Sequence, residues 1–217
     1  MRIVLLGAPG AGKGTQCKRI VERYNLLHLS SGDILRKERA EGSELGKQAQ
    51  GYMDQGALVP DELIVEMMAK AIDDAPDSGY VLDGFPRTVN QAAELDKALK
   101  AKGQSIDAVV NLVIDDGVIT RRLTGRRSCP QCGAVYHIEN MPPKVDNKCD
   151  KDGVELVHRS DDTVEVFQNR LKTYHDQTKP VIGYYQKTSS VFDVDADKAV
   201  DQVSNLIFDK LDSLAKA

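Results

Sequence analysis

A glycine-rich junction near the N-terminus constrains the fold of this chain more than any other feature. Residues 7–15 read GAPGAGKGT; they follow a short aliphatic run and lead into a helical pattern at 13–24. Glycines at such a junction let backbone N–H groups turn inward around an anion, the helix N-terminus adds positive potential, and Lys13 can reach terminal phosphates. The match to GxxxxGK[ST] is imperfect, because Gly14 stands in the Ser/Thr position and Thr15 comes one residue later. We predict a phosphate-binding loop (P-loop) between a buried strand and a helix.

Short apolar runs alternate with helical patterns along the chain. The runs predicted as strands lie near 2–6, 27–30, 80–83, 108–114 and 190–194. The helical patterns lie near 13–24, 61–73, 88–102, 116–123, 163–187 and 198–215. Such alternation is typical of βαβ units, in which helices cover both faces of a parallel sheet. The sequence therefore predicts an α/β fold with a doubly wound, parallel, five-stranded sheet.

Two stretches interrupt this alternation. Residues 30–59 carry only short helical patterns punctuated by glycines, and residues 126–160 contain three prolines, three cysteines and no helical period. A structureless loop of about 35 residues is uncommon inside a compact domain unless it is functional or stapled. We expect a mobile helical insert at 30–59 and a small subdomain at 126–160. The remaining residues, 1–29, 60–125 and 161–217, are expected to form the core domain.

Length, charge and hydropathy exclude several classes of protein. The 217 residues carry a net charge of −4, so no overall basic field would attract nucleic acid or an anionic membrane. The longest unbroken apolar run covers residues 3–6, whereas a spanning helix needs about 18–20 residues. Residues 1–30 also lack the apolar core and cleavage site of a signal peptide. We expect a cytoplasmic protein with small-molecule partners, in which local Lys and Arg side chains meet any polyanionic substrate.

The cysteines suggest a metal site. Cys129-x2-Cys132 is followed, after sixteen further residues, by Cys149-x2-Asp152, which is the spacing of two facing knuckles. Zinc takes tetrahedral sulfur, nitrogen or oxygen ligands, and structural sites usually fill all four positions with protein atoms. Because this segment has almost no apolar core, the ion would supply its folding free energy. We predict a structural Zn²⁺ site, although Co²⁺ or Fe²⁺ also fits such ligands.

The fourth ligand of this site has three candidates. Asp152 is preferred to Asp150 because it preserves the x2 spacing, and His137 is the reserve candidate. The alternative is three reduced cysteines in a loop without metal. Cys17 lies apart on the first helix and is interpreted as a small buried side chain.

Four further motifs follow the glycine-rich junction in a characteristic order. They are Ser30-Ser31-Gly32-Asp33 with Arg36, Gly56-Ala57-Leu58-Val59-Pro60, Asp83-Gly84-Phe85-Pro86-Arg87-Thr88 with Gln91, and Thr124-Gly125-Arg126-Arg127. Their order and spacing resemble those of adenylate kinases, including the long-lid form that carries a metal-binding insert. The resemblance covers essentially the whole chain. It implies a monomeric enzyme that transfers a phosphoryl group reversibly and directly from Mg·ATP to AMP as a lid closes, which maintains the balance of adenine nucleotides.

The resemblance also implies which residues form the site. Residues 30–59 would be the nucleoside-monophosphate insert (NMP insert), and residues 126–160 the lid. The expected ATP-binding residues are Gly10, Ala11, Gly12, Lys13, Gly14, Thr15, Arg126, Val135, Tyr136 and Lys198. The expected AMP-binding residues are Ser31, Arg36, Ala57, Leu58, Val59, Gly84, Phe85, Pro86, Arg87, Gln91, Arg159 and Arg170. The expected catalytic residues are Lys13, Asp83, Arg87, Arg126, Arg159 and Arg170.

Arginines dominate that set for a physical reason. Phosphoryl transfer depends on positioning and charge neutralisation, which several guanidinium groups around one phosphate supply. The resemblance implies that Arg36 and Arg87 grip the acceptor, and that Arg126, Arg159 and Arg170 close on the transferring group. A nucleoside monophosphate has a second pKa near ~6, so it needs no general base at pH 7. The four histidines, His28, His137, His158 and His175, are therefore interpreted as strand, surface or lid residues.

Base and cofactor recognition rest on fewer residues. The Asp83 carboxylate closes a predicted strand, where it could hold a water of Mg²⁺ or cap its own turn. Gln91 can both donate to and accept from adenine. Kinases of UMP and CMP typically have Asn where this chain has Thr88, which favours AMP as the acceptor. Ser31 stands where the family usually has Thr and keeps the hydroxyl. The choice between adenine and guanine at the donor site stays open.

Other functions fit less of the sequence. Residues 147–150 read NKCD, which matches the guanine-reading motif of regulatory GTPases, and Asp150-x-x-Gly153 matches a second GTPase motif. These two motifs overlap, occur in reverse order and follow no apolar strand. A zinc-ribbon nucleic-acid binder would share the knuckles, but the insert has few aromatic residues and the chain is acidic. Another nucleoside monophosphate kinase, or one that uses GTP, remains open within the enzyme class.

Overall fold

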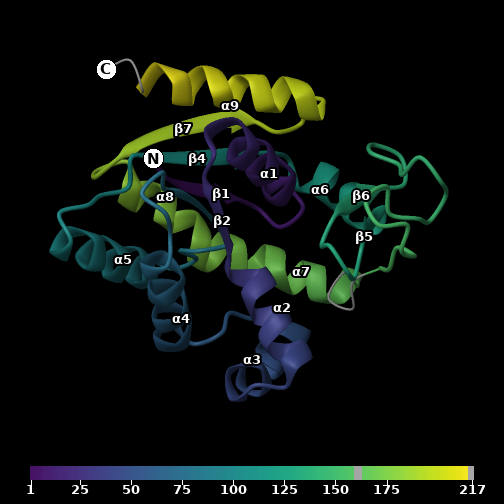
Figure 1. Cartoon of the computed structure of the whole chain (residues 1–217), viewed down its shortest axis with the longest axis horizontal. Coiled ribbons are helices and arrows are strands. Elements are labelled where there is room, and N and C mark those ends of the chain that lie inside the picture. Colours follow the sequence, from purple (N-terminus) through teal and green to yellow (C-terminus); the bar gives the residue numbers. More distant parts are fainter. Residues whose placement is uncertain (159–162, 215–217) are drawn as a thin grey trace.

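The buried aliphatic runs form a five-stranded parallel sheet (Figure 1). The computed structural model describes residues 1–158 and 163–214 of the chain. The strands are β1 (Arg2–Gly7), β2 (Leu27–Ser30), β3 (Tyr80–Asp83), β4 (Ala108–Val113) and β7 (Ser190–Asp195). They pair in parallel in the order β2-β3-β1-β4-β7. The five strands predicted from the sequence, and the fold class, are confirmed.

Different helices cover the two faces of the sheet, because successive side chains of a strand point to opposite faces. One face carries α1 (Lys13–Tyr24) and α9 (Val200–Leu214), and the other carries α4 (Asp61–Asp73), α5 (Val89–Ala101) and α8 (Lys179–Tyr185). On β1, Ile3 and Leu5 pack with the first group, whereas Val4 and Leu6 pack with the second. Both faces of β1 are therefore buried, which explains why its sequence is a continuous apolar run.

The order of the strands creates a crevice at one end of the sheet. From β1 the chain crosses over to β2 at one edge of the sheet. From β3 it crosses over β1 in the opposite direction to reach β4. In open α/β sheets, ligands bind beyond the carboxyl ends of strands at such a switch point. Leu5 of β1 pairs with Asp83 at the end of β3. The glycine-rich junction and Asp83 therefore face the same crevice.

The expected NMP insert (30–59) contains two helices that stand away from the sheet (Figure 1). They are α2 (Ser31–Glu41) and α3 (Glu44–Asp54), as the short helical patterns predict. A Cβ at Gly46 would lie 2.3 Å from the carbonyl oxygen of Glu38. The two helices therefore approach each other more closely than a side chain at this position would allow.

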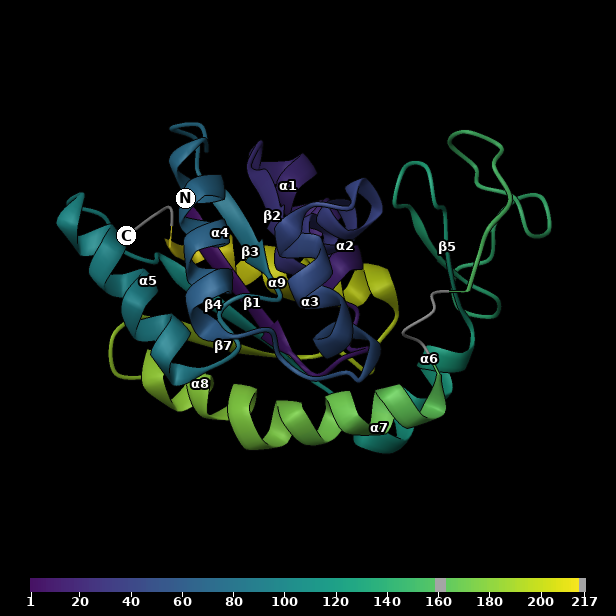
Figure 2. The same cartoon turned by 90° about the horizontal axis from the view of Figure 1, so that it is seen from below.

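The lid contains a short antiparallel ribbon, which Figure 2 shows to one side of the sheet. The ribbon is formed by β5 (Arg126–Ser128) and β6 (Val135–His137). Beneath it lies a small buried cluster of Cys129, Ala134, Tyr136, Cys149 and Leu156. Such a cluster is small compared with the two sheet-based cores, as the composition of this segment led us to expect.

The helical pattern predicted over 163–187 is divided into three pieces. These are α7 (Val164–Thr173), a π-helical turn (Tyr174–Thr178) and α8, which form one long run in Figure 2. Pro180 lies in the first turn of α8, and in a regular helix its ring would clash with a carbonyl four residues earlier. The wider π turn accommodates this proline.

The remaining helices agree with the sequence pattern to within two residues, which is the usual uncertainty at helix ends. The predicted helices at 88–102, 116–123 and 198–215 are α5, α6 (Asp116–Thr124) and α9. Within residues 1–158 and 163–214, no helix combines the length and apolar character needed to cross a membrane.

Candidate functional site

A cavity of about 890 Å³ lies at the carboxyl ends of β1 and β3. Its lining includes most of the residues predicted for the donor nucleotide and for catalysis. These are Gly10, Ala11, Gly12, Lys13, Gly14, Thr15, Asp83, Arg87, Arg126, Val135, Tyr136, Arg170 and Lys198. Residues far apart in the sequence thus converge on the crevice that the strand order creates.

A second cavity of about 60 Å³ adjoins the first. Its lining includes most of the residues predicted for the acceptor: Ser31, Arg36, Ala57, Leu58, Val59, Gly84, Arg87, Gln91 and Arg170. The two cavities share several residues, including Arg36, Arg87 and Arg170. These arginines therefore lie at the boundary between the two cavities.

Among the described residues, one residue predicted to bind nucleotide lines neither cavity. Phe85 is 1% exposed and belongs to the core that packs against α4 and α5, although its neighbour Pro86 lines the larger cavity. Its burial gives it a packing role. Arg159 lies outside the residues that the structure describes.

The glycine-rich junction adopts the conformation that its glycines allow. Gly10 and Gly12 have φ angles of 84° and 95°, which side chains other than glycine rarely adopt. Lys13 is folded into the loop, and its Nζ donates hydrogen bonds to the carbonyl oxygens of Gly7 at 2.7 Å and Ala8 at 2.9 Å. The ammonium group is therefore held at the point where the loop and the N-terminus of α1 meet the cavity.

The environment of Lys13 disfavours its charged form. Burial lowers the pKa of Lys13 to about 8; the nearby carboxylate of Asp83 opposes this shift, while Arg87 and Arg170 reinforce it. A buried cation surrounded by further cations favours an anionic ligand. Phosphate bound at the loop would offset this repulsion between cations.

Asp83 and His28 form a pair on the floor of the larger cavity. Nε2 of His28 lies 3.3 Å from Oδ2 of Asp83, and both side chains line the cavity. A Cβ at Gly14 would lie 3.7 Å from the same carboxylate, so Asp83 lies beneath the start of α1. Asp83 lines the cavity, where its carboxylate could hold a water of Mg²⁺, and the capping of its own turn stays the alternative.

The loop after β3 shapes the arginine cluster. Nε of Arg87 donates to the carbonyl oxygen of Gly84 at 2.7 Å, and the hydroxyl of Ser31 donates to the same oxygen at 2.6 Å. A Cβ at Gly84 would lie 2.9 Å from the Arg87 guanidinium. The glycine therefore lets Arg87 and Ser31 meet at one carbonyl group.

The other arginines are held by different contacts. Arg36 forms an ion pair with Asp33 one turn earlier in α2. The aliphatic part of Arg170 packs close to Gly56, where an added Cβ would lie 2.9 Å from its Cγ. Gly56 belongs to the NMP insert and Arg170 to α7, so this contact links the insert to the core.

Gln91 is buried where the acceptor base is expected. Its Oε1 accepts from the backbone N–H of Arg87 at 2.7 Å, and its Nε2 donates to Asp61 at 2.7 Å. A carboxamide offers two acceptor sites and two donors. Gln91 therefore keeps one donor and one acceptor for a purine edge while its orientation is fixed by the protein.

Sequence reasoning did not single out Arg122, which also lines the larger cavity. Its Nη1 donates to the carbonyl oxygen of Ala196 at 2.8 Å, and its Nη2 lies 3.6 Å from Asp197. Arg122 lies outside the Thr124–Arg127 motif, so no motif of the sequence marked it. His28 was likewise interpreted as a strand residue; its strand position is confirmed, but its contact with Asp83 was not expected.

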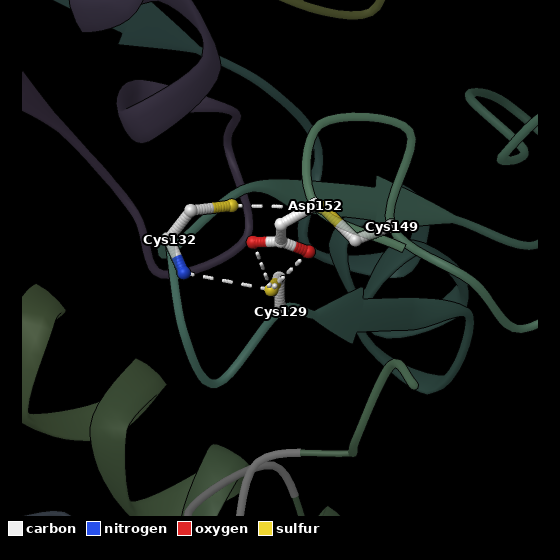
Figure 3. Close-up of side chains that lie close together, drawn as sticks. All are labelled: Cys129, Cys132, Cys149 and Asp152. Atoms are coloured by element: carbon white, nitrogen blue, oxygen red, sulfur yellow. Dashed lines mark hydrogen bonds between the residues drawn. The ribbon is translucent and has the colours of Figure 1, made fainter. Parts of the chain in front are cut away.

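The lid brings together the four predicted metal ligands (Figure 3). The Sγ atom of Cys129 lies 3.4 and 3.2 Å from the carboxylate oxygens of Asp152, and those of Cys132 and Cys149 lie 3.5 Å apart. A tetrahedral ion with metal–sulfur distances of about 2.3 Å holds its ligand atoms roughly 3.5–3.8 Å apart. These four side chains therefore have the donors and the spacing to bind a metal ion.

The alternatives for the fourth ligand point elsewhere. A carboxylate oxygen of Asp150 accepts from the backbone N–H of Lys144 at 2.8 Å. Nδ1 of His137 accepts from the backbone N–H groups of Glu139 and Asn140. Asp152 is the acidic residue whose carboxylate faces the thiols, as its spacing predicts.

Comparisons with known proteins agree with this arrangement. A family model described as adenylate kinase matches residues 5–190. The chain is 50% identical over 204 residues to a protein named adenylate kinase from Clostridioides difficile, and the match covers 94% of each chain. A protein of the same name from Archaeoglobus fulgidus is 48% identical over 205 residues, again with 94% of each chain covered. Another from Finegoldia magna is 45% identical over 212 residues, which cover 97% of this chain and 99% of that one.

The lowered pKa of Lys13 predicts a pH-dependent contribution to stability. The pKa is about 8 in the folded protein and 10.5 ordinarily, so between these values the folded state binds fewer protons than the unfolded state. Stability from this group therefore increases as the pH rises through that window. Between pH 7 and pH 10, we expect the unfolding free energy of Lys13→Met to fall by ~1–3 kcal/mol relative to the parent protein.

Urea denaturation at the two pH values measures this difference. Lys210→Met, which changes an exposed lysine on α9, is the matched control and should differ from the parent by the same amount at both pH values. An equal pH response of the two variants would contradict the assignment of a buried ammonium group at Lys13.

Proposed function

The chain belongs to the adenylate kinase family, and from this premise we propose that its cavities perform the reversible transfer of a phosphoryl group from Mg·ATP to AMP, giving two ADP. The observation that carries the proposal is the position of Arg36, Arg87 and Arg170 between the phosphate-loop cavity and the smaller cavity. Two anionic nucleotides that meet end to end need positive charge at the point of contact. Direct transfer then needs no covalent intermediate on the protein.

In this proposal the phosphate loop holds the donor. The N–H groups of the loop and the ammonium of Lys13 bind its phosphates, as expected for a lysine at a loop-to-helix junction. The ribbon residues Val135 and Tyr136, with Arg122 and the backbone near Lys198, border the same cavity and would contact the rest of the nucleotide. Arg122 extends the predicted donor set by one cation.

Magnesium is expected to enter with ATP. The carboxylate of Asp83 faces the cavity beside the loop, and hard oxygen donors of this kind suit Mg²⁺ or a water bound to it. When bound, the ion neutralises charge on the phosphates. Asp83 would orient that ion, and Lys13 would bind the phosphates.

The acceptor would occupy the smaller cavity. Arg36 and Arg87 would bind its phosphate, and Gln91 would use its remaining donor and acceptor to read the adenine edge. Because the phosphate of AMP is already a nucleophile near neutral pH, these residues need only to position it. Catalysis is then the alignment of two phosphates and the neutralisation of the charge that develops between them.

We propose that the NMP insert (30–59) and the lid (126–160) close over the core, formed by 1–29, 60–125 and 161–217. Nζ of Lys18 on α1 donates to the carbonyl oxygen of Gly133 in the lid at 2.9 Å, so the lid already reaches the core near the phosphate loop. Closure would bring Arg126 to the transferring group. It would also exclude water, which suppresses hydrolysis of ATP.

We propose that the lid cluster binds Zn²⁺ as a structural ion. Three thiolates and one carboxylate fill a tetrahedral site with protein ligands, which is typical of structural zinc. Backbone N–H groups of Cys132 and Lys151 approach the sulfur atoms of Cys129 and Cys149 at 3.5 Å, and such contacts orient the ligands. Zinc would stabilise a lid whose apolar cluster is small.

The first test is ADP formation by the purified protein with Mg·ATP and each of AMP, UMP, CMP and GMP, repeated with Mg·GTP as the donor. We expect turnover with ATP and AMP and little with the other pairs. Preference for another pair would leave the arginine arrangement in place but contradict Gln91 as the residue that reads adenine. Absence of turnover with every pair would contradict the proposed function.

Arg87→Ala tests the arginine cluster. Loss of one pre-positioned donor to a transferring group costs about 10²–10³-fold in turnover, so we expect a loss of at least that size. The melting temperature should change little, because the side chain lies at a cavity. Arg39→Ala is the matched control, since Arg39 pairs with Asp54 on the exposed surface. Equal activity of the two variants would contradict the role of Arg87.

Asp152→Asn tests the metal site against Asp150→Asn. The two residues are close in sequence, but only Asp152 faces the thiols, so Asp152→Asn should weaken zinc binding at least tenfold and lower the melting temperature. Asp150→Asn should retain about one zinc per chain. Metal analysis after dialysis and thermal unfolding measure both effects. Equal zinc content and stability in the two variants would contradict the assignment of Asp152.

A further inference from the structure

Three side chains with metal-binding atoms converge beside the larger cavity, away from the lid cluster. They are Cys17 on α1, His28 on β2 and Asp83 at the end of β3. One ligand atom of each lies within 4.8 Å of the others, and His28 Nε2 lies 3.3 Å from Asp83 Oδ2. Within residues 1–158 and 163–214, this trio and the lid cluster are the two groups that meet this spacing.

The register of the sheet fixes this convergence. His28 pairs with Val81, which lies two residues before Asp83 and packs with Cys17 in the core beneath α1. Because alternate residues of a strand share a face, the side chains of His28 and Asp83 both point toward α1. Their proximity to Cys17 therefore depends on the backbone of two adjacent strands and one helix.

The three donors select a class of ion. A thiolate, an imidazole and a carboxylate together suit Zn²⁺ and chemically similar ions such as Co²⁺, whereas Mg²⁺ prefers oxygen ligands alone. The nearby ammonium of Lys13 is a repulsive neighbour, but it is engaged by the carbonyl oxygens of Gly7 and Ala8. The carboxylate and the thiolate supply two negative charges to offset it.

The position of the trio leaves one side of the ion accessible. Cys17 is fully buried, while His28 and Asp83 line the cavity with 22% and 13% of their side chains exposed. An ion can therefore enter from the cavity. Three protein ligands would leave a fourth tetrahedral position for an external ligand.

We propose that Cys17, His28 and Asp83 form a second metal site, which binds Zn²⁺ or a similar ion and thereby inhibits phosphoryl transfer. The thiol of Cys17 releases its proton to solvent, and its sulfur binds the ion with Nε2 of His28 and one oxygen of Asp83. The bound ion withdraws Asp83 from the Mg·nucleotide and occupies the space beside Lys13. Binding of the ion is independent of the proposed function, whereas the inhibition rests on it.

Titration of the metal-free protein with Co²⁺ tests the site directly. Thiolate-to-cobalt charge-transfer absorption should saturate at two equivalents in the parent protein and at one in Cys17→Ala. His28→Gln keeps the buried thiol of Cys17 but removes the imidazole ligand, so this variant should also saturate at one equivalent of Co²⁺. Cys129→Ser, which alters the lid cluster alone, should keep the cavity site. Saturation of the parent protein at one equivalent would overturn the proposal.

Zinc inhibition of ADP formation tests the consequence. With the lid loaded and Mg·ATP in excess, the Zn²⁺ concentration for half-inhibition should be at least tenfold higher for Cys17→Ala than for the parent, while turnover without added zinc stays the same. Equal inhibition of the parent and of Cys17→Ala would overturn the proposal that zinc inhibits by binding to Cys17, His28 and Asp83. Formation of Zn·ATP would then be the cause of inhibition. If the parent has no kinase activity, the proposed function fails, and the Co²⁺ titration still decides the metal site.

Discussion

The turn between β1 and α1 is the constraint on which the rest of the site depends. Backbone N–H groups can surround an anion there only because Gly10 and Gly12 adopt positive φ angles. This tight turn also draws the Lys13 ammonium into the loop, where burial lowers its pKa to about 8. The elements that follow are positioned around this cation: Asp83 beneath the first turn of α1, and Arg87 and Arg170 across the cavity.

Helix α7 contacts the end of the expected NMP insert (30–59). Arg170 packs close to Gly56 of the NMP insert, and the amide of Asn169 donates to the carbonyl oxygen of Gln55 at 3.5 Å. The same helix begins shortly after the lid and continues through a π turn into the core (Figure 2). Its π turn lies where Tyr174 and Thr178 line the larger cavity, so the departure from regular helix occurs at the site itself.

The central strands β1, β3 and β4 were predictable because both faces of the sheet are covered there, which makes each of them a largely apolar run. The edge strands β2 and β7 are only partly buried, and their shorter apolar patterns were still sufficient to identify them. The π turn was not predictable, because a period of 3.6 residues does not reveal one wider turn ahead of Pro180. The three-residue strands β5 and β6 are too short to show an alternating pattern.

The site residues that belong to motifs were predictable, because these motifs occur in a characteristic order along the chain. A motif places its residues near the cavity, but it does not say which way each side chain points. Phe85 was therefore expected at the acceptor although its ring is part of the core, whereas Pro86 beside it does line the cavity. His28 and Arg122 carry no motif of their own, and only the sheet register and the fold of α6 bring them to the cavity.

The two candidate metal sites both contain cysteine and aspartate ligands, but they differ in the number of protein ligands and in their exposure to the cavity. In the lid, four side chains from two facing knuckles enclose one point, and Cys129 and Cys149 are buried. A site that fills its coordination sphere with protein atoms is suited to hold structure. At the second site, three side chains supply the donors, and two of them, His28 and Asp83, line the cavity that the phosphate loop borders. An ion bound there would retain a position for an external ligand and would compete directly with the interactions that hold the phosphates. The opening that admits the nucleotide would therefore also admit Zn²⁺ or a similar ion, which would inhibit the enzyme.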